Sequence, residues 1–202
     1  MFWWLVSRAS GVVALVLITL SVLMGLAMAS RVLPPGALKR TVARLHEHVA
    51  LTALAAIGLH GLSLLGDQWL KPGLRGIAVP FALGYRPGFT GVGVIAGYLA
   101  VLVGPSFYLR RLVGAKRWRK VHRVSILVWA LSAVHTLGAG SDGHRVWLRA
   151  VVLLPVVPLA YLLVLRILRG QPQRERSVDQ RRVSVGPSRA NSSQREPLPQ
   201  RS

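Results

Sequence analysis

The chain has 202 residues, of which 52% are hydrophobic, and 26 Lys and Arg residues against six acidic residues give it a net charge of +20. Its apolar residues form long uncharged runs, not the short periodic patches of a soluble core, which excludes an ordinary soluble domain. The lack of cysteine excludes disulfides, iron–sulfur clusters and covalently attached haem.

Five charge-free apolar stretches follow one another along the chain. They cover residues 9–30, 49–66, 91–109, 124–140 and 150–165. Stretches of this length between charged flanks are typical of transmembrane helices, in which the backbone satisfies its own hydrogen bonds. The first stretch is long for the apolar core of a signal peptide, so we expect it to remain as a helix. We predict an all-α integral membrane bundle of about five transmembrane helices in residues 1–169.

Basic residues are concentrated in alternate connections between these helices. The first and third connections contain Arg31, Lys39, Arg40, Arg44, Arg110, Arg111, Lys116, Arg117, Arg119, Lys120 and Arg123. The positive-inside rule places them in the cytoplasm, with the N-terminus outside and the C-terminus inside. Because the charge flanks membrane spans, we expect a lipid bilayer as the partner and no nucleic acid. Residues 170–202 are rich in Arg, Ser, Gln and Pro, which predicts a disordered basic cytoplasmic tail.

Two of the predicted helices each contain or adjoin two histidines. His60 comes fourteen positions after His46, and His135 comes thirteen positions after His122. These spacings correspond to ~21 and ~20 Å along a helix, within a hydrocarbon layer of ~30 Å. Since one helix separates the two, both run in the same direction. We therefore expect His46 to pair with His122, and His60 with His135.

The angular positions of the histidines add a condition. At ~100° per residue, His60 lies within ~40° of His46, but His135 lies ~140° from His122. We therefore predict a local distortion, such as a π-bulge or a tight turn, between His122 and His135. His48 competes with His46 for the inner position, but it lies ~120° from His60, so His46 is favoured.

Histidines inside membrane spans are candidate functional residues. The alternative is that each one is a buried polar residue bonded to a neighbouring helix. Four histidines at matched depths on two parallel helices favour metal or haem ligation. Two ligands at each depth leave the tetrahedral set of zinc incomplete. Without cysteine, any haem must be of the b type, held by histidine and packing.

Four segments carry a resemblance to a known family. They are residues 45–49 (LHEHV), 59–61 (LHG), 116–123 (KRWRKVHR) and 134–136 (VHT). Over about residues 3–140 the chain resembles the ferric reductase-like transmembrane domain, found in ferric reductases, NADPH oxidases and the haem subunit of the periplasmic methionine-sulfoxide reductase system. The resemblance implies two b haems, ligated by His46, His60, His122 and His135, that pass electrons across the bilayer. Residues 7–11 (SRASG) resemble the preceding family helix, which implies that Arg8 lies near the outer haem.

The chain also departs from this family. The oxidases carry extra histidines near the outer haem, where this chain has Ala56 and Leu64, which disfavours superoxide production. Larger members continue into flavin and nicotinamide domains, whereas only the short segment 170–202 follows Arg169, so we expect an oxidoreductase component without such a domain. The glycines of residues 91–97 (GVGVIAG) resemble a dinucleotide-binding fingerprint but lie in a predicted span with no strand before them. Close helix packing is the expected use of Gly93 and Gly97.

The resulting prediction is a di-haem b electron-transfer protein of the bacterial plasma membrane. We expect it to take electrons from a flavoprotein or a quinol. The acceptor is expected on the outer side, as ferric iron, oxygen or a periplasmic protein. Reduction is expected at the haem edge near Arg8, Arg75 or Arg86. The alternative is a non-redox scaffold or a proton-linked transporter that uses the histidines as a relay, although the sequence has no inverted repeat or carboxylate pathway.

Three further arginines are candidates for holding the inner haem propionates. They are Arg44, Arg119 and Arg123, since arginine forms charge-assisted bonds with carboxylates. The alternative is that they are ordinary positive-inside flanking residues.

Overall fold

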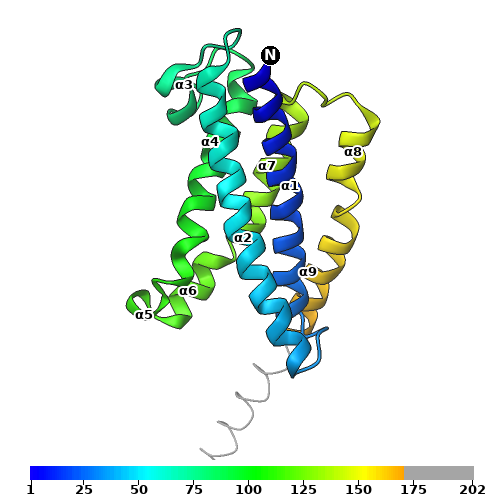
Figure 1. Ribbon diagram of the computed structural model, residues 1–202. Helices are drawn as coiled ribbons and strands as arrows, with labels where there is room; N and C mark the ends of the chain where they lie inside the picture. Colours follow the sequence, from blue (N-terminus) through cyan, green and yellow to red (C-terminus); the bar gives the residue numbers. More distant parts are fainter. Residues whose placement is uncertain (171–202) are drawn as a thin grey trace, which may run out of the picture. The chain divides into compact units, whose positions relative to one another are not determined.

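The computed structural model describes residues 1–170 (Figure 1). Residues 171–202, which contain nearly all of the predicted disordered tail, lie outside the described part. The chain divides into two units, residues 1–166 and residues 167–202. The described residues of the second unit form the end of a helix. Residues 1–170 consist of helices and turns without a β-strand, which confirms the predicted all-α fold.

Five helical segments of the described chain are long and apolar enough to span a membrane, so the chain is an integral membrane protein. The longer helices are α1 (Phe2–Ala29), α2 (Ala37–Ser63), α4 (Pro87–Val103), α6 (Ala115–His122), α7 (Ser125–Ala139), α8 (Val146–Leu153) and α9 (Val156–Gly170). Short turns of helix join or extend them: η1 (Leu64–Gly66), α3 (Gly73–Ala78), η2 (Pro105–Phe107) and α5 (Arg110–Val113). Helix α2 begins well before the uncharged stretch from which it was predicted. The basic residues that flank the span are themselves helical and form the first turns of α2.

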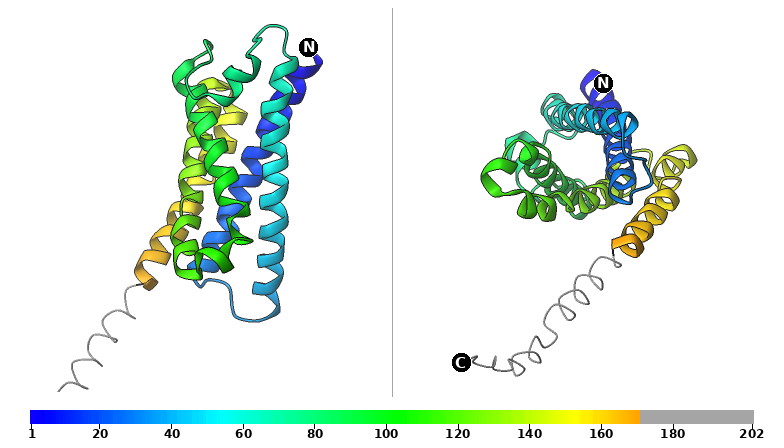
Figure 2. Two further views of the ribbon diagram at one scale, coloured as in Figure 1. Left: turned by 90° about the vertical axis from the view of Figure 1, so that its left-hand side faces the viewer. Right: turned by 90° about the horizontal axis from the view of Figure 1, so that it is seen from below.

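Helices α1, α2, α4 and α7 surround a common axis, as the view from below in Figure 2 shows. Each of these helices contacts the next around the ring. Helices α2 and α7 run in the same direction, as predicted (Figure 1). Helices α8 and α9 pack on the outside of α1, where Val152 and Leu159 join its buried apolar residues Leu15, Ile18 and Val22.

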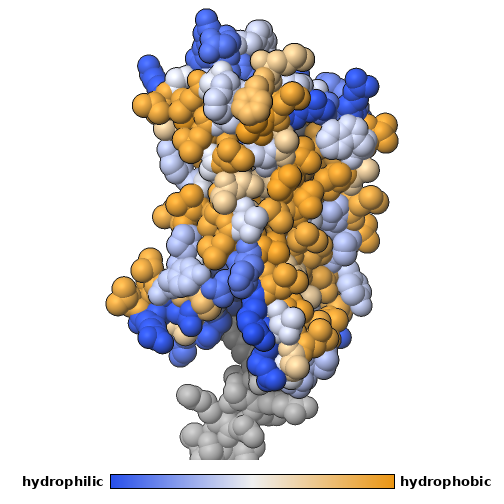
Figure 3. Space-filling model, viewed as in Figure 1, coloured by the Kyte–Doolittle hydropathy of each residue, from blue (hydrophilic) through white to orange (hydrophobic). Residues whose placement is uncertain are grey.

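The outward surface of the bundle is largely apolar. Large exposed side chains include Leu20, Leu51, Val101 and Tyr161. Figure 3 shows that apolar residues cover much of one face and that hydrophilic residues gather toward its ends. A surface of this kind is stable against hydrocarbon, which agrees with the membrane assignment.

The helix that carries the second pair of histidines is interrupted at residues 123–124, between α6 and α7. Here the backbone N–H groups of Arg123, Val124 and Ile126 each donate to the carbonyl three residues before. Such bonds wind the chain at ~120° per residue instead of ~100°. The tighter winding turns His135 toward the side of His122, so the predicted distortion is confirmed.

One hydrogen bond joins α1 to α7 within the buried core. The indole N–H of Trp129 donates to Thr19 Oγ1 at 3.0 Å, and this hydroxyl donates to the carbonyl of Leu15. We expect Thr19→Val to lower the free energy of unfolding in detergent by about 1 kcal/mol, since it leaves the indole N–H without its acceptor. Trp129→Phe removes the donor of the same bond and completes a double-mutant cycle. The loss of stability in the double variant is expected to be smaller than the sum of the two single losses. Fully additive losses would contradict an energetic role for this bond.

Candidate functional site

The structure brings the four histidines together in two pairs. The ring centroids of His46 and His122 are 6.0 Å apart, with the ring planes at 86°. The centroids of His60 and His135 are 6.1 Å apart, with the planes at 73°. The predicted pairing is therefore confirmed. Because His46 and His60 lie on one continuous helix, their spacing in sequence separates the pairs by ~21 Å along the bundle.

The distance within each pair fits a single shared metal ion. A metal–nitrogen bond of ~2 Å on each side, with each nitrogen ~1.2 Å from its ring centre, puts two ring centroids ~6 Å apart. The geometry therefore agrees with one metal centre for each pair.

In three of the four histidines the second ring nitrogen faces a backbone carbonyl of a neighbouring helix. The Nδ1–carbonyl pairs are His46 with Ser21 at 2.9 Å, His60 with Ser7 at 2.8 Å, and His135 with Phe89 at 2.9 Å. A carbonyl only accepts, so Nδ1 must carry the proton and Nε2 keeps its lone pair. Metal-binding histidines are oriented in this way, with the second nitrogen bonded and the first free to ligate.

Helix α1 supplies both carbonyls that face α2. The hydroxyl groups of Ser7 and Ser21 also lie 3.2 Å from the Nδ1 atoms of His60 and His46. Both serines are buried. Their spacing in the sequence equals that of the two histidines on the antiparallel helix. Sequence reasoning gave these serines no role toward the histidines, and the repeated spacing is the signal that would have identified it.

Glycines let two of the imidazole rings approach a neighbouring backbone. They are Gly11 against His60 and Gly93 against His135, whereas a Cβ at Gly25 would meet His46 at an ordinary 3.5 Å. Close packing at Gly93 was predicted, and the structure shows that the group it accommodates is an imidazole. At Gly97 a Cβ would meet Ile57 at 4.0 Å, which is ordinary van der Waals contact. Any side chain at Gly11 or Gly93 would occupy the space that the imidazole ring takes. The close packing there suits rings that must stay in one place.

His122 is held differently from the other three histidines. Its Nδ1 is buried and has no hydrogen-bond partner within residues 1–170. Its ring stacks on Trp118, one helical turn before it on α6, with centroids 5.1 Å apart and planes at 27°. At this position the imidazole ring contacts an aromatic ring by stacking and has no contact with a backbone carbonyl through Nδ1.

Two other histidines lie apart from the pairs. His48 is exposed, and its Nδ1 contacts the carbonyl of Arg44, one turn before it on the same helix. The preference for His46 over His48 is therefore confirmed for the pairing. His144 is exposed in the connection after α7.

The acidic neighbour of His46 bonds to a residue outside the spans. Tyr108 donates its hydroxyl hydrogen to Glu47 Oε1 at 2.7 Å. This hydrogen bond, together with the carboxylate charge, raises the pKa of Tyr108 above its usual value. Glu47 is thus engaged by a tyrosine and not by either imidazole of the neighbouring pair.

The candidate arginines lie at both ends of the bundle. Arg8 follows Ser7 at the His60–His135 end, where it forms an ion pair with Asp142 and lies over the ring of Trp4. Arg44, Arg119 and Arg123 are exposed near His46 and His122 in sequence. Sequence reasoning did not single out Arg166. This half-buried residue of α9 lies close enough to His122 and Arg123 to interact electrostatically with both.

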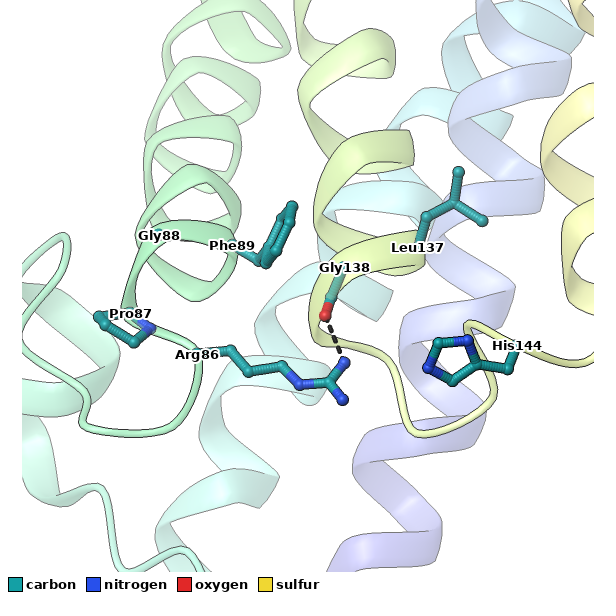
Figure 4. A pocket seen from close by; sticks show the side chains of 7 residues that line it. All are labelled: Arg86, Pro87, Gly88, Phe89, Leu137, Gly138 and His144. Carbon is teal, nitrogen blue, oxygen red and sulfur yellow. Dashed lines mark hydrogen bonds between the residues drawn. The ribbon is translucent and has the colours of Figure 1, made fainter.

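A pocket of about 580 Å³ opens beside the His60–His135 pair, between the start of α4 and the end of α7 (Figure 4). Arg86 lies on its wall and donates from Nη1 to the carbonyl of Gly138 at 2.6 Å. Phe89, which also lines the pocket, supplies the carbonyl that faces His135. His144 lies across from Arg86 (Figure 4). Arg75, the other arginine expected at this end, is exposed on α3.

The donor set of each pair consists of two imidazoles. Within residues 1–170, no three side chains of His, Cys, Asp or Glu gather into a metal-binding cluster. Two imidazoles are too few for a tetrahedral zinc site. They would complete the coordination of an iron whose other four ligands came from a porphyrin, so the residues fit haem b. No protein-family model matches the chain, and no solved structure matches it either.

Proposed function

We propose that this chain is a di-haem b electron-transfer protein, similar to the ferric reductase-like membrane domains, that relays electrons across a bacterial plasma membrane. The observation that carries the proposal is the pair of ~6 Å imidazole separations at two levels of one bundle. Three of the four rings also have Nδ1 on a carbonyl, which frees Nε2 for iron. When bound, haem supplies reversible one-electron chemistry between ferric and ferrous iron.

The residues of the chain would hold and orient the cofactors. His46 and His122 would ligate one iron, and His60 and His135 the other. With an imidazole on each side, neither iron would keep an open position for a substrate. An acceptor would therefore be reduced at the edge of the site. At the two ends, Arg8, Arg44, Arg119 and Arg123 are candidates for pairing with propionates.

The distribution of charge favours one orientation. Under the positive-inside rule the basic connection around α5 and α6 faces the cytoplasm, with the C-terminus on that side and the N-terminus outside. The His60–His135 pair then lies toward the outer leaflet, next to the pocket at Arg86. This pocket is the favoured place for an outer acceptor, whether a ferric complex, oxygen or a surface of a periplasmic protein.

The electron donor would approach the opposite end. The basic residues there include Arg110, Arg111, Lys116, Arg117, Arg119 and Lys120. A cytoplasmic flavoprotein with an acidic surface would be steered by this charge, and its rate of reduction would fall as salt rises. A quinol would arrive through the lipid, and its rate would change little with salt. Stopped-flow reduction at low and high ionic strength distinguishes these donors.

Transfer across the membrane is testable in sealed proteoliposomes with a reductant trapped inside and ferricyanide outside. We expect reduction of external ferricyanide that depends on the protein. His46→Ala is expected to abolish most of this rate, because it removes a ligand from one of the two pairs. This pair lies nearer the trapped reductant in one orientation of the protein in the vesicle and nearer the acceptor in the other. His48→Ala, which alters an exposed histidine on the same helix, is the matched control and is expected to retain the rate. A colourless, folded preparation without transfer would favour the alternative of a scaffold or proton-linked transporter.

A further inference from the structure

The two histidine pairs are not equivalent. In the His60–His135 pair both Nδ1 atoms face carbonyls, at 2.8 and 2.9 Å. In the His46–His122 pair only His46 has such a contact. The Nδ1 of His122 is buried without a hydrogen-bond partner in the described chain. A buried N–H group without an acceptor is uncommon and costs free energy, so its environment calls for an explanation.

The environment of His122 is aromatic. Trp118 stacks on the imidazole with centroids 5.1 Å apart, and its own Nε1 is buried without a hydrogen-bond partner among residues 1–170. The rings of Phe107 and Trp118 pack edge to face, with centroids 5.8 Å apart. The guanidinium of Arg110 covers Phe107, 3.6 Å from its ring centroid. The stack therefore covers one face of the imidazole at a place where both unpartnered nitrogen atoms are buried.

We propose that Trp118 is a positioning residue for His122: it fixes the plane of the imidazole by stacking and shields Nδ1 from water, which makes the His46–His122 centre the one with the higher reduction potential. The inference rests on the proposed haem ligation. It concerns how the chain makes two centres with the same ligands behave differently.

The direction of the difference follows from ligand basicity. An Nδ1–H group that donates to a carbonyl makes the imidazole a stronger electron donor toward the metal. A stronger donor stabilises ferric iron more than ferrous iron and lowers the potential. The His60–His135 pair has two such bonds and the His46–His122 pair has one. The centre at His122 is therefore easier to reduce.

Substitution of Trp118 tests this assignment. Trp118→Leu opens space beside a polar Nδ1, which allows water to enter and accept its hydrogen bond. We expect the higher of two midpoint potentials to shift downward, with the lower one unchanged. One of two low-spin ferric signals in electron paramagnetic resonance should also shift or broaden as the imidazole plane becomes less fixed. Trp118→Phe keeps a stacking ring and is expected to stay close to the unmodified protein.

Controls separate positioning from general damage. Trp147→Leu removes a partly exposed indole on α8 and is expected to change neither midpoint. The couple that moves in Trp118→Leu should be the one missing from His122→Ala. If Trp118→Leu does not accumulate, Trp118→Met, whose flexible side chain has a similar volume and also lacks a stacking ring, is expected to shift the same couple.

Three results would overturn the inference while leaving haem ligation intact. They are unchanged midpoints and signals in the Leu and Met variants, a shift of the other couple, and a shift in Trp118→Phe as large as in Trp118→Leu. An unmodified protein that binds no haem overturns this inference and the proposed function together.

Discussion

His60→Ala is expected to bind about one haem per chain where the unmodified protein binds about two, because one imidazole alone holds a b haem far more weakly than a pair does. His122→Ala is expected to do the same at the other centre. Each variant should retain the spectrum of the remaining bis-histidine site. Haem content by the pyridine haemochrome assay, divided by protein content, measures the effect.

Both substitutions are also expected to lower the thermal stability of the detergent-solubilised protein. A cofactor that binds only the folded state stabilises it by mass action, and losing one of two cofactors removes that contribution. His48→Ala is the matched control, since His48 lies close to His46 in the sequence but is exposed. Full haem content in both His60→Ala and His122→Ala would contradict the ligand assignment. A loss in His48→Ala as large as theirs would show that the effect is not specific to the pairs.

The second large effect is expected from a methyl group at Gly11. A Cβ there would lie 2.9 Å from Nδ1 of His60 and 3.1 Å from Cε1. The ring cannot retreat easily, because its Nδ1 is bound to the carbonyl of Ser7. We expect Gly11→Ala to displace the imidazole, to weaken the centre at His60 and His135, and to cost about 1–3 kcal/mol in stability.

Helix α1 offers a matched control for this substitution. At Gly25, near the other end of the same helix, a Cβ would meet His46 Cε1 at 3.5 Å, an ordinary contact. Gly25→Ala is therefore expected to keep both haems and nearly the full stability. Gly93→Ala, on the other side of the His60–His135 pair, is expected to resemble Gly11→Ala. Equal behaviour of Gly11→Ala and Gly25→Ala would contradict the close approach that the structure shows at His60.

Much of the fold could be predicted because membrane spans follow from composition and length alone. The pairing of the histidines followed from counting residues and helices. The interruption at residues 123–124 followed from a spacing between His122 and His135 that a regular helix cannot place on one side. The predicted start of helix α2 was too late, because the charged residues before the apolar stretch were taken to end the span. The helix in fact begins at Ala37 and includes the flanking residues Lys39 and Arg40.

The surroundings of the histidines were harder to predict. Ser21 looks like an ordinary residue of an apolar helix, and its role appears only when α1 is laid antiparallel to α2. Trp118 and His122 are one helical turn apart, so they share a helix face. A tryptophan near a membrane surface is more simply interpreted as an interfacial anchor.

The contacts of the arginines could not be predicted because they depend on the conformations of the connections between helices. Arg8 pairs with Asp142, a residue distant in sequence that lies in the connection after α7. Arg86 adopts a left-handed backbone with φ of 42° at the start of α4, a conformation that sequence does not signal for a side chain of this kind. That conformation accompanies the hydrogen bond of its guanidinium to Gly138 beside the pocket.

Optical and electron paramagnetic resonance spectra of the purified protein from haem-replete cells test the ligation of haem by the two pairs most directly. The account predicts a low-spin, six-coordinate b-type haem with two imidazole ligands, present at about two per chain. A folded preparation without haem, or one whose haem is high-spin and five-coordinate, would contradict it.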